Sequence, residues 1–322
     1  MSTGTELDRR PLGLEQVPAW TELLAAISAA DGDTELLSED NVREEFDEPG
    51  CDFERGSVAL YDGAAMVGYT MLVARDSATD SHDMWQFGGV HPAYRRLGLG
   101  TELLTWAERA ARPLHSEQFP GLPLTLSGRC LVGNDSAMAL FAVGGYTQAR
   151  WFHEMRCELS AARVSQPLVP GVEVANLSAK LFGEALAVRN EAFRDHWGST
   201  ELSPESWDRH VRSSAFRPDY SFLGYLDGAP TAVVVSSEYE AYQEATGKRE
   251  LYVHVVGTLK ASRGRGIASG LLALALARAR ADGFDSASLE VDADSPTGAL
   301  GLYERLGFGV SATRVTQRKP LP

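Results

Sequence analysis

Two stretches of the chain decide the fold: MWQFGGVHPAYRRLGLGTELLTWAERAA (84–111) and LYVHVVGTLKASRGRGIASGLLALALARARA (251–281). Each reads as a β-rich run, a short loop, a glycine-rich turn and then a helical pattern. In both stretches the helical pattern starts directly at the glycines. A pattern that recurs within 322 residues, a length typical of two domains, predicts two copies of one domain.

The similarity extends upstream of these stretches. Asp62-Gly63 and Asp227-Gly228 each stand between two apolar runs. Because both positions of an Asp-Gly pair tolerate positive φ, each pair predicts a β-hairpin.

A third matched pair lies downstream: LFAVGGY (140–146) and LYERLGF (302–308), each preceded by a strand-like run. The spacing in the first half is six residues longer, and we assign the difference to a loop at PLHSEQFPG (113–121).

The segment SQPLVPG (165–171), with two Pro and a Gly, predicts the join between the copies. We therefore expect an α/β (α+β) fold with two tandem domains, residues 1–164 and 171–322. Each should hold a mixed, mostly antiparallel sheet flanked by helices.

Composition narrows the functional classes. The net charge of -14 opposes a general affinity for nucleic acid or anionic membranes. The acidity lies in residues 1–164, with 25 acidic and 13 basic residues, against 19 acidic and 17 basic in the remainder. Charged residues interrupt the first 30 positions and no run reaches 18 apolar residues, so we predict neither export nor a membrane span.

The cysteines are odd in number and widely spaced, at Cys51, Cys130 and Cys157. This pattern suits neither a disulfide framework nor a CxxC metal site. We expect a cytoplasmic protein without a bound metal.

RRLGLG (95–100) and RGRGIA (263–268) resemble the pyrophosphate-binding turn of the GNAT superfamily of acetyl-CoA-dependent acyltransferases. DSPTGALGLYERLGF (294–308) resembles the final helix and Gly-Phe strand entry of that family. The resemblance covers both halves, in a tandem arrangement similar to that of mycothiol synthase-like actinobacterial enzymes. It implies an N-acetyltransferase that uses acetyl-CoA as co-substrate.

The resemblance also implies an opening between two parallel strands of each domain, where the pantetheine arm would lie and the pyrophosphate would meet the glycine turn. In the second half it assigns the cofactor to Val256, Thr258, Arg263, Gly264, Arg265, Gly266, Ile267, Ala268, Ser269 and Ser295. In the first half it assigns Val90, Arg95, Arg96, Gly98, Gly100, Thr101 and Asn134. Ser295 and Asn134 equally suit helix N-caps.

The family's general-acid position falls on Tyr303. A phenol with a pKa near ~10 is matched to protonate a thiolate leaving group near ~8.5. The first half has Phe141 there, which has no proton to give, so we expect the first domain to be catalytically degenerate. Simple packing of both rings beneath the last helix is the competing interpretation.

The family often places a Glu base five residues before the position of Gly257, where this chain has Tyr252. Alternation along a strand puts Glu250, Tyr252 and His254 on one face. We prefer His254 as the base because its reference pKa is close to neutrality, with Glu250 acting through water as the alternative. The first-half counterpart of Tyr252 in this count is Met84.

For the acceptor pocket we predict His196, Trp197, Glu201 and Tyr252, although an ordinary helix and loop explains the first three as well. The acceptor would be the primary amine of a small molecule, and the protein a monomer with an internal pseudo-dimer or a weak homodimer. Three alternatives remain: a non-catalytic acyl-CoA sensor, a peptide or protein N-acetyltransferase, and catalysis in the first half, whose glycine turn is the cleaner match.

Overall fold

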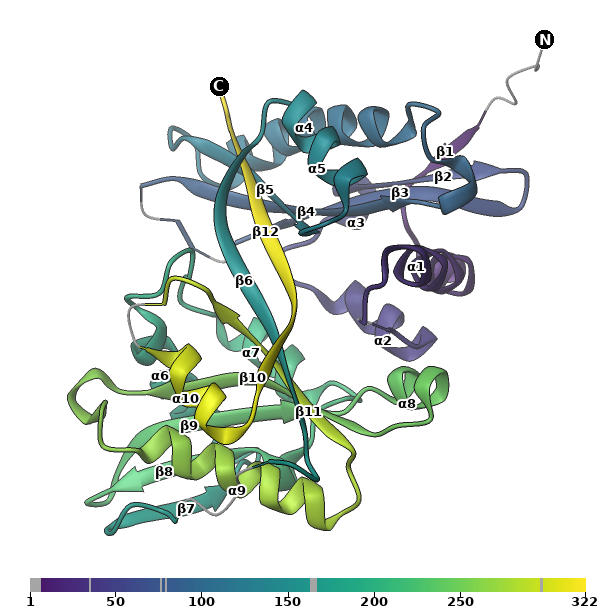
Figure 1. Cartoon of the computed structure of the whole chain (residues 1–322). Helices are drawn as coiled ribbons and strands as arrows, with labels where there is room; N and C mark the ends of the chain where they lie inside the picture. The colour runs from purple at the N-terminus through teal and green to yellow at the C-terminus, as the bar shows by residue number, and fades with distance from the viewer. Residues whose placement is uncertain (1–6, 35, 76, 79, 163–166, 296–297) are drawn as a thin grey trace. The chain divides into compact units, whose positions relative to one another are not determined.

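The computed structural model of the chain describes residues 7–34, 36–75, 77–78, 80–162, 167–295 and 298–322 (Figure 1). It contains two compact units. Unit 1 comprises Met1–Arg150 and Arg314–Pro322, and unit 2 comprises Trp151–Thr313.

Unit 1 is a sheet with strand order β1-β2-β3-β4-β5-β12, in which only β4 and β5 run parallel. Its strands are β1 (Asp8–Arg10), β2 (Ser57–Asp62), β3 (Ala65–Ala74), β4 (His82–Val90), β5 (Leu124–Leu131) and the end of β12 (Gly309–Leu321). Its helices are α1 (Val17–Asp31), α2 (Glu39–Glu44), α3 (Phe53–Gly56), α4 (Leu99–Gln118) and α5 (Asp135–Val143), with 3-10 turns at Leu14–Gln16, Glu45–Asp47 and Pro92–Tyr94.

Unit 2 repeats this plan with strand order β7-β8-β9-β10-β11-β6, in which only β10 and β11 run parallel. Its strands are β6 (Thr147–Glu158), β7 (Val172–Asn176), β8 (Phe222–Leu226), β9 (Ala229–Ser237), β10 (Glu250–Thr258) and β11 (Ser286–Asp292). Its helices are α6 (Phe182–Phe193), α7 (Pro204–Arg212), α8 (Glu240–Thr246), α9 (Ile267–Ala281) and α10 (Ala299–Leu306), with 3-10 turns at Pro218–Tyr220 and Lys260–Ser262. The prediction of two mixed, mostly antiparallel sheets with flanking helices is confirmed.

In each unit, the strand that pairs with the second of the two parallel strands comes from the other predicted half of the sequence. The end of β12 pairs with β5, from Arg314 opposite Leu131 to Leu321 opposite Leu124. Likewise β6 pairs with β11 of unit 2. The compact units therefore differ from the predicted halves 1–164 and 171–322 at their last strands, because a strand edge is covered by whichever segment the connections bring to it. Residues 165 and 166 of the predicted join lie outside the described residues.

Both predicted hairpins are present. Asp227 and Gly228 have φ values of 52° and 77°, as a two-residue hairpin turn between β8 and β9 requires. The prediction of a loop over 113–121 is wrong, because α4 continues to Gln118. Pro113 removes one backbone donor, whereas burial of Leu114 and His115 anchors the last turns of the helix on the core.

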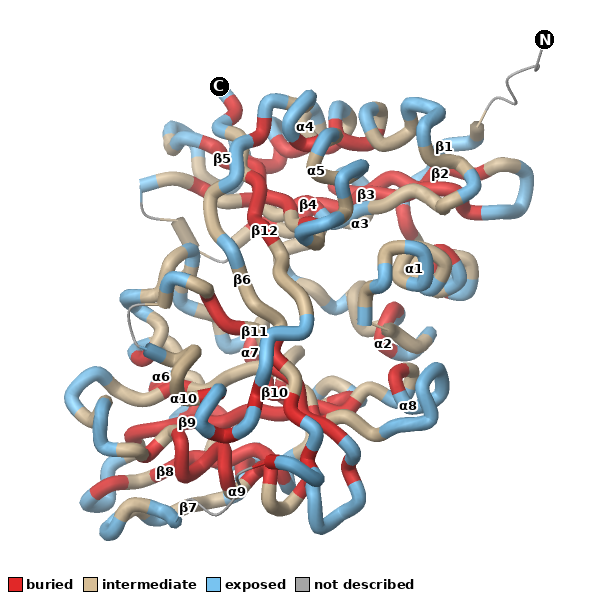
Figure 2. The backbone as a smooth tube through the Cα atoms, in the orientation of Figure 1, coloured by how far each residue is buried: buried red, intermediate tan, exposed pale blue. Residues whose placement is uncertain are grey.

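Unit 2 has a core on each face of its sheet. Many of the residues marked as buried in Figure 2 lie in its strands. Leu251 and Val253 of β10 belong to the core that also contains the buried residues of α9 and α10. Val255 packs instead against the core formed with α6 and α7. Val253 and Val255, which regular alternation would place on one face, therefore lie on opposite faces of the sheet. None of the helices in the described ranges has the length and apolar character needed to cross a bilayer.

Candidate active site

The two parallel strands of each unit pair only at their beginnings. In unit 2 the pairing of β10 with β11 runs from Glu250–Ser286 to Val253–Leu289, although both strands continue beyond it. In unit 1 the pairing of β4 with β5 ends at Trp85–Ser127. Beyond these points one edge of β10 and one edge of β4 lack a ladder partner, which leaves their backbone groups open to a strand-like ligand.

A β-bulge distinguishes the second parallel pair from the first. The register of β9 with β10 shifts between Val253 and Val255, so His254 is an extra residue in its strand. The corresponding register of β3 with β4 is continuous from Gly68–Val90 to Ala74–Met84. Bulges re-aim side chains next to active sites, and here the re-aimed side chain is the predicted base.

The bulge also corrects the matching of the two halves. Met84 is buried in the core under α4 and α5 of unit 1. Tyr252 lies instead beside His254, on the face of the unit 2 sheet that α7 covers. Counted from the bulge, the counterpart of Tyr252 is Trp85. Counting residues along the sequence gave Met84 because the count did not include the extra residue at the bulge, His254.

His254 lies in a cluster of aromatic side chains. Its ring centroid is 4.5 Å from that of Tyr252 and 4.5 Å from that of His210, which stands on α7. Its Nε2 is 3.3 Å from the Tyr239 hydroxyl oxygen, within hydrogen-bond distance. The predicted shared face of Tyr252 and His254 is therefore present. His210 and Tyr239 were missed from the sequence, although helical spacing from the buried Trp207 places His210 toward the sheet.

Burial and the nearby His210 lower the pKa of His254 well below 6.5. Burial likewise lowers the pKa of His210 to about 4, and the His210 Nε2 is enclosed without a hydrogen-bond partner in the described chain. Both imidazoles are thus neutral at pH 7. The reference pKa of histidine therefore does not apply to His254, because its ring is desolvated.

Glu250 is engaged at the start of β10. It forms an ion pair of 2.8 Å with Arg156 and accepts a hydrogen bond of 3.0 Å from the Ser286 hydroxyl. Burial raises its pKa, and Arg156 opposes that shift. Its carboxylate oxygens are thus held by Arg156 and Ser286.

Tyr303 stands on α10 and is only 7% exposed. Its ring packs edge-on against Phe308 at 6.1 Å. Burial raises its pKa, so the phenol keeps its proton, and no described side chain hydrogen-bonds to its hydroxyl. Tyr303 belongs to the core under α9 and α10, the face opposite His254.

Phe141 takes the matching place in unit 1. Its ring packs edge-on against Tyr146 at 5.2 Å, as Tyr303 does against Phe308. It also lies directly over Gly128, where an added Cβ would stand 2.7 Å from the end of the ring. The packing is conserved between the units while the hydroxyl is not.

The glycine turns have the same backbone form in both units. Gly264 and Gly266 have φ values of 75° and 82°, and their counterparts Arg96 and Gly98 have 66° and 88°. Glycine adopts this left-handed region without steric cost, whereas Arg96 does not.

The helices that follow begin without a capping side chain. Gly266 and Gly98 are the N-caps of α9 and α4, and neither helix has a side-chain cap bond. The first bonds of these helices run from Gly270 to Gly266 and from Glu102 to Gly98. The amide groups of residues 267–269 and 99–101 are therefore available to an anion such as pyrophosphate.

The arginines that open the turns hold the loops in place. Arg263 donates through Nε to the Thr258 carbonyl at 3.2 Å and through Nη2 to the Ala192 carbonyl at 2.7 Å. Arg95 donates in the same way to Val90 and pairs with Asp31. Arg265, which follows in the same turn, is exposed.

Of the two predicted helix-start residues, Asn134 caps α5 by accepting from the Ala137 amide at 3.1 Å. Ser295 does not cap α10, whose N-cap is Gly298.

The predicted acceptor residues lie in the segment after α6. Asn190 fixes this segment with two hydrogen bonds of 3.0 Å to the backbone of Leu202. The His196 ring is tilted by 40° against that of Phe193, with centroids 4.6 Å apart, and the ring centroid of Trp197 lies 6.3 Å from that of Phe152.

The charge environment of His196 connects it with the cofactor turn. Burial, followed by Arg263, lowers its pKa, and Asp292 of β11 opposes the shift. His196 is thus within electrostatic reach of the end of the parallel pair. Glu201 is exposed.

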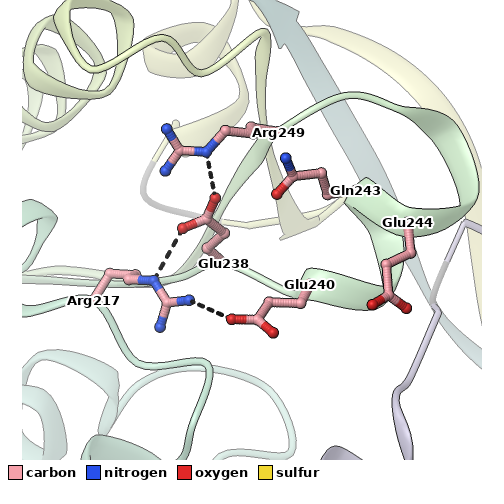
Figure 3. A pocket seen from close by; sticks show the side chains of 6 residues that line it. All are labelled: Arg217, Glu238, Glu240, Gln243, Glu244 and Arg249. Carbon is pink, nitrogen blue, oxygen red and sulfur yellow. Dashed lines mark hydrogen bonds and ion pairs between the residues drawn. The ribbon is translucent and has the colours of Figure 1, made fainter.

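A polar pocket of about 330 Å³ lies at the start of β10 (Figure 3). Glu238 sits between Arg217 at 3.0 Å and Arg249 at 2.7 Å. Burial raises the pKa of Glu238, but the two arginines together outweigh burial and lower it. Arg249 also donates to the Asp282 carbonyl. These bonds tie β9, β10 and the turn after α9 together. The remaining lining residues are Glu240, Gln243 and Glu244. The described residues contain no group of His, Cys, Asp and Glu arranged to hold a metal ion.

Comparisons with known proteins agree with this geometry. The model of the acetyltransferase (GNAT) family matches residues 20–144 and 186–308. The mycothiol acetyltransferase of Salinispora arenicola is 29% identical over 82% of this chain and 80% of its own. That of Corynebacterium efficiens is 29% identical over 92% of this chain and 90% of its own.

Solved structures share the tandem fold. A GCN5-related N-acetyltransferase from Sphaerobacter thermophilus is 25% identical, with a TM-score of 0.74 over 98% of this chain and 96% of that one. A tandem GNAT protein from the clavulanic acid biosynthesis pathway has a TM-score of 0.75 over 98% and 99%, at 16% identity. The resemblance predicted from the glycine turns is confirmed.

Proposed function

The chain belongs to the acetyltransferase (GNAT) family, and from that premise we propose that unit 2 transfers an acetyl group from acetyl-CoA to the primary amine of a small molecule. One observation carries the assignment to this unit. Only unit 2 combines an uncapped helix after left-handed glycines, a bulge in the strand beside it, and a phenol on the final helix.

In this proposal the pyrophosphate of acetyl-CoA accepts hydrogen bonds from the amides at the start of α9. The pantetheine arm adds to the open edge of β10, where Val256 and Thr258 supply backbone groups. The thioester then lies between the two faces of the sheet, with Tyr303 on one side and His254 on the other.

The amine nitrogen attacks the thioester carbonyl carbon, and its proton passes to His254 directly or through water. The C–S bond of the tetrahedral intermediate then breaks, and the Tyr303 hydroxyl gives its proton to the departing sulfur. The products are an amide and the free thiol of CoA. The proton held by His254 returns to the phenolate through solvent, so the protein ends in its starting state.

The depressed pKa of His254 fits an uncharged acceptor amine. An imidazole that stays neutral does not repel an ammonium group, but it is a weak base. We therefore propose that the pKa of the acceptor amine falls when it enters the aromatic cluster of Tyr239, Tyr252 and His254. Desolvation favours the neutral form of the amine, so a larger fraction of it is unprotonated there.

The test is release of CoA thiol across a panel of amines, with mass analysis of the acetylated product. The panel includes the mycothiol precursor, because curated relatives are named mycothiol acetyltransferases, together with aminoglycosides, polyamines and peptide N-termini. Turnover of a small amine is the expected result. Calorimetric binding of acetyl-CoA without acetylation of any panel member would instead support a sensor.

A further inference from the structure

Among the described residues, one hydrogen bond reaches the His254 ring: its Nε2 lies 3.3 Å from the Tyr239 hydroxyl oxygen. Burial and the nearby His210 keep this ring neutral at pH 7, so one ring nitrogen carries a hydrogen and the other a lone pair. A phenol, with a reference pKa near ~10, gives up its proton more readily than a neutral imidazole gives up its ring hydrogen. The Tyr239 hydroxyl is therefore the donor in this bond and His254 Nε2 is the acceptor.

The direction of this bond decides how a proton can reach His254. With Nε2 as the acceptor, the ring hydrogen is on Nδ1, and the lone pair that can bind a proton points at the Tyr239 oxygen. An amine or a water molecule cannot give a proton to that nitrogen without displacing the phenol. The hydroxyl itself can transfer one, because its oxygen can accept a proton while its own proton moves along the existing bond to Nε2.

Tyr239 is held in place by the residue before it. The buried carboxylate of Glu238 lies between the guanidinium groups of Arg217 and Arg249, as Figure 3 shows. The Glu238 amide also donates to the Ala215 carbonyl at 2.9 Å. Glu238 therefore fixes the backbone at the start of α8, where Tyr239 is the N-cap residue.

The residues after Tyr239 hold it as well. Its carbonyl accepts from the Tyr242 amide at 3.1 Å. Arg156 donates to the Tyr242 hydroxyl oxygen and forms an ion pair of 2.8 Å with Glu250. Because Glu250 is the first residue of β10, these contacts tie α8 to the strand that carries His254. A hydroxyl supported from both sides keeps its place when a substrate enters.

The hydroxyl belongs to the aromatic cluster in which we place the acceptor amine. The Tyr239 ring centroid is 6.3 Å from that of Tyr252, which is in turn 4.5 Å from that of His254. Tyr239, Tyr252 and His254 are all half-buried, so the cluster keeps part of its surface open. An amine in this cluster can therefore reach the Tyr239 oxygen.

The corresponding connection of unit 1 differs in sequence. The segment between β3 and β4 is RDSATDS (75–81), which contains no aromatic residue. The segment between β9 and β10 is EYEAYQEATGKR (238–249), which supplies both α8 and Tyr239. The paired phenol and imidazole thus occur in the same unit as the phenol of Tyr303.

We propose that Tyr239 relays the amine proton to His254, an inference that rests on the acetyl transfer proposed above. As the amine nitrogen bonds to the thioester carbon, one N–H bond breaks and its hydrogen forms an O–H bond at the Tyr239 oxygen. The original O–H bond of Tyr239 breaks in the same step, and that hydrogen forms an N–H bond at Nε2. Tyr239 remains a neutral phenol and His254 becomes an imidazolium, so atoms and charge balance. The relay takes the place of direct or water-mediated transfer.

Nitrogen-15 spectra of the full chain, labelled at its histidines, test the direction of the bond without any acceptor amine. The His254 signals are those that disappear in His254→Asn. At pH 7 we expect the hydrogen on Nδ1 and a bare, hydrogen-bonded nitrogen at Nε2. Tyr239→Phe should shift the Nε2 signal, whereas Tyr225→Phe, which removes a hydroxyl that donates to Glu184, should not. A hydrogen on Nε2 in the unmutated chain would overturn the proposal.

Turnover with the best amine of the panel tests the relay itself. Tyr239→Phe should lower kcat by roughly 100-fold, the usual contribution of a general base. The KM for acetyl-CoA should not change, because we place that contact at the glycine turn. The double variant Tyr239→Phe/His254→Asn should lie within about twofold of the slower single variant, since groups that act as one unit are not additive. Full activity of Tyr239→Phe, or losses that multiply in the double variant, would overturn the proposal.

The relay and the proposed function fail in different ways. A hydrogen on Nε2 overturns the relay even if amines are acetylated, whereas a bare Nε2 with no acetylation of any amine overturns the proposed function. Thermal unfolding shows whether each variant is folded. Should Tyr239→Phe not fold, the spectrum of the unmutated chain still decides the direction of the bond.

Discussion

The two units are copies of one plan that differ at three positions around the parallel strands. Unit 2 has the bulge at His254, the phenol of Tyr303 and glycine at position 264. Unit 1 has a continuous strand, the ring of Phe141 and a left-handed arginine at position 96. The form of the glycine turn and the open strand edge is thus retained in both units, while the two groups to which we assign proton transfer, His254 and Tyr303, occur in unit 2.

The largest expected difference between the units comes from their glycine turns. Gly266→Glu forces a side chain into a left-handed position and sets a carboxylate against the amides that would receive pyrophosphate. We expect a loss of roughly 100-fold or more in kcat/KM, by analogy with the removal of a key electrostatic contact. The matched variant Gly98→Glu in unit 1 should change kcat/KM less than twofold. If only Gly98→Glu lowered kcat/KM, catalysis would have to be assigned to unit 1.

The second difference is the bulged histidine. His254→Asn should lower kcat by roughly 100-fold, the usual contribution of a general base. Tyr225→Phe, on β8, where the hydroxyl donates to Glu184, serves as a control for removing a polar group from the same unit. Rates measured with excess acetyl-CoA separate this loss from weaker binding, and full activity of His254→Asn would point to Glu250 or another base.

The pH profile sharpens the same comparison. The pKa of His254 is lowered by burial and by His210, so the active neutral form persists below pH 6.5. The other groups that face it are the phenols of Tyr239 and Tyr252. His210→Asn removes one of the two causes, so the acid limb of kcat/KM should move to higher pH while the plateau is retained. An unmoved acid limb would show that another group sets it.

A smaller effect concerns the stability of unit 1. His82 and His115 share a hydrogen bond of 2.9 Å between their Nδ1 atoms, and burial lowers the pKa of His82 to about 4. A depressed pKa means that the unfolded chain binds the proton first, so stability is full above about pH 6.5 and falls as the pH drops toward 4. The expected loss is about 2 kcal/mol between pH 7 and pH 5.

Urea unfolding at the two pH values measures this loss. His82→Leu should remove about that much of the pH dependence. Phe119→Leu removes the ring 4.5 Å from His82 but keeps the imidazole pair, so it should retain the dependence. If the free energy of unfolding fell by the same amount between pH 7 and pH 5 in His82→Leu and in the unmutated chain, His82 would be excluded as the source of the pH dependence.

The smallest effect is backbone strain at Arg96, in the glycine turn of unit 1. Arg96→Gly should stabilise the protein by about 0.5–1 kcal/mol, since the left-handed conformation costs an arginine more than a glycine. Gly264→Arg in unit 2 should cost about the same amount. Denaturant midpoints measure both changes, and destabilisation by Arg96→Gly would mean that the arginine side chain contributes more than its backbone costs.

The local features could be predicted from the sequence because they depend on nearby residues. Asp227-Gly228 makes its hairpin, Gly266 starts its helix, and Tyr252 shares a face with His254 for reasons that a short window contains. The family resemblance followed from these local features.

The features that were not predicted depend on distant partners. The pairing of β12 with β5 depends on how the chain connects its units. The bulge at His254 exists only relative to the register of β9. The contact of His210 with His254 joins a helix and a strand 44 positions apart, and it changes the chemistry that the reference pKa of His254 suggested.

The most direct test of the division between the units is the kcat of CoA release by Tyr303→Phe, measured beside Phe141→Tyr with saturating acetyl-CoA and the best amine of the panel. We expect a roughly 100-fold fall for Tyr303→Phe with unchanged thermal unfolding, because the thiolate loses its proton donor. We expect neither gain nor loss for Phe141→Tyr. Full activity of Tyr303→Phe would contradict the assignment of chemistry to unit 2 through this phenol.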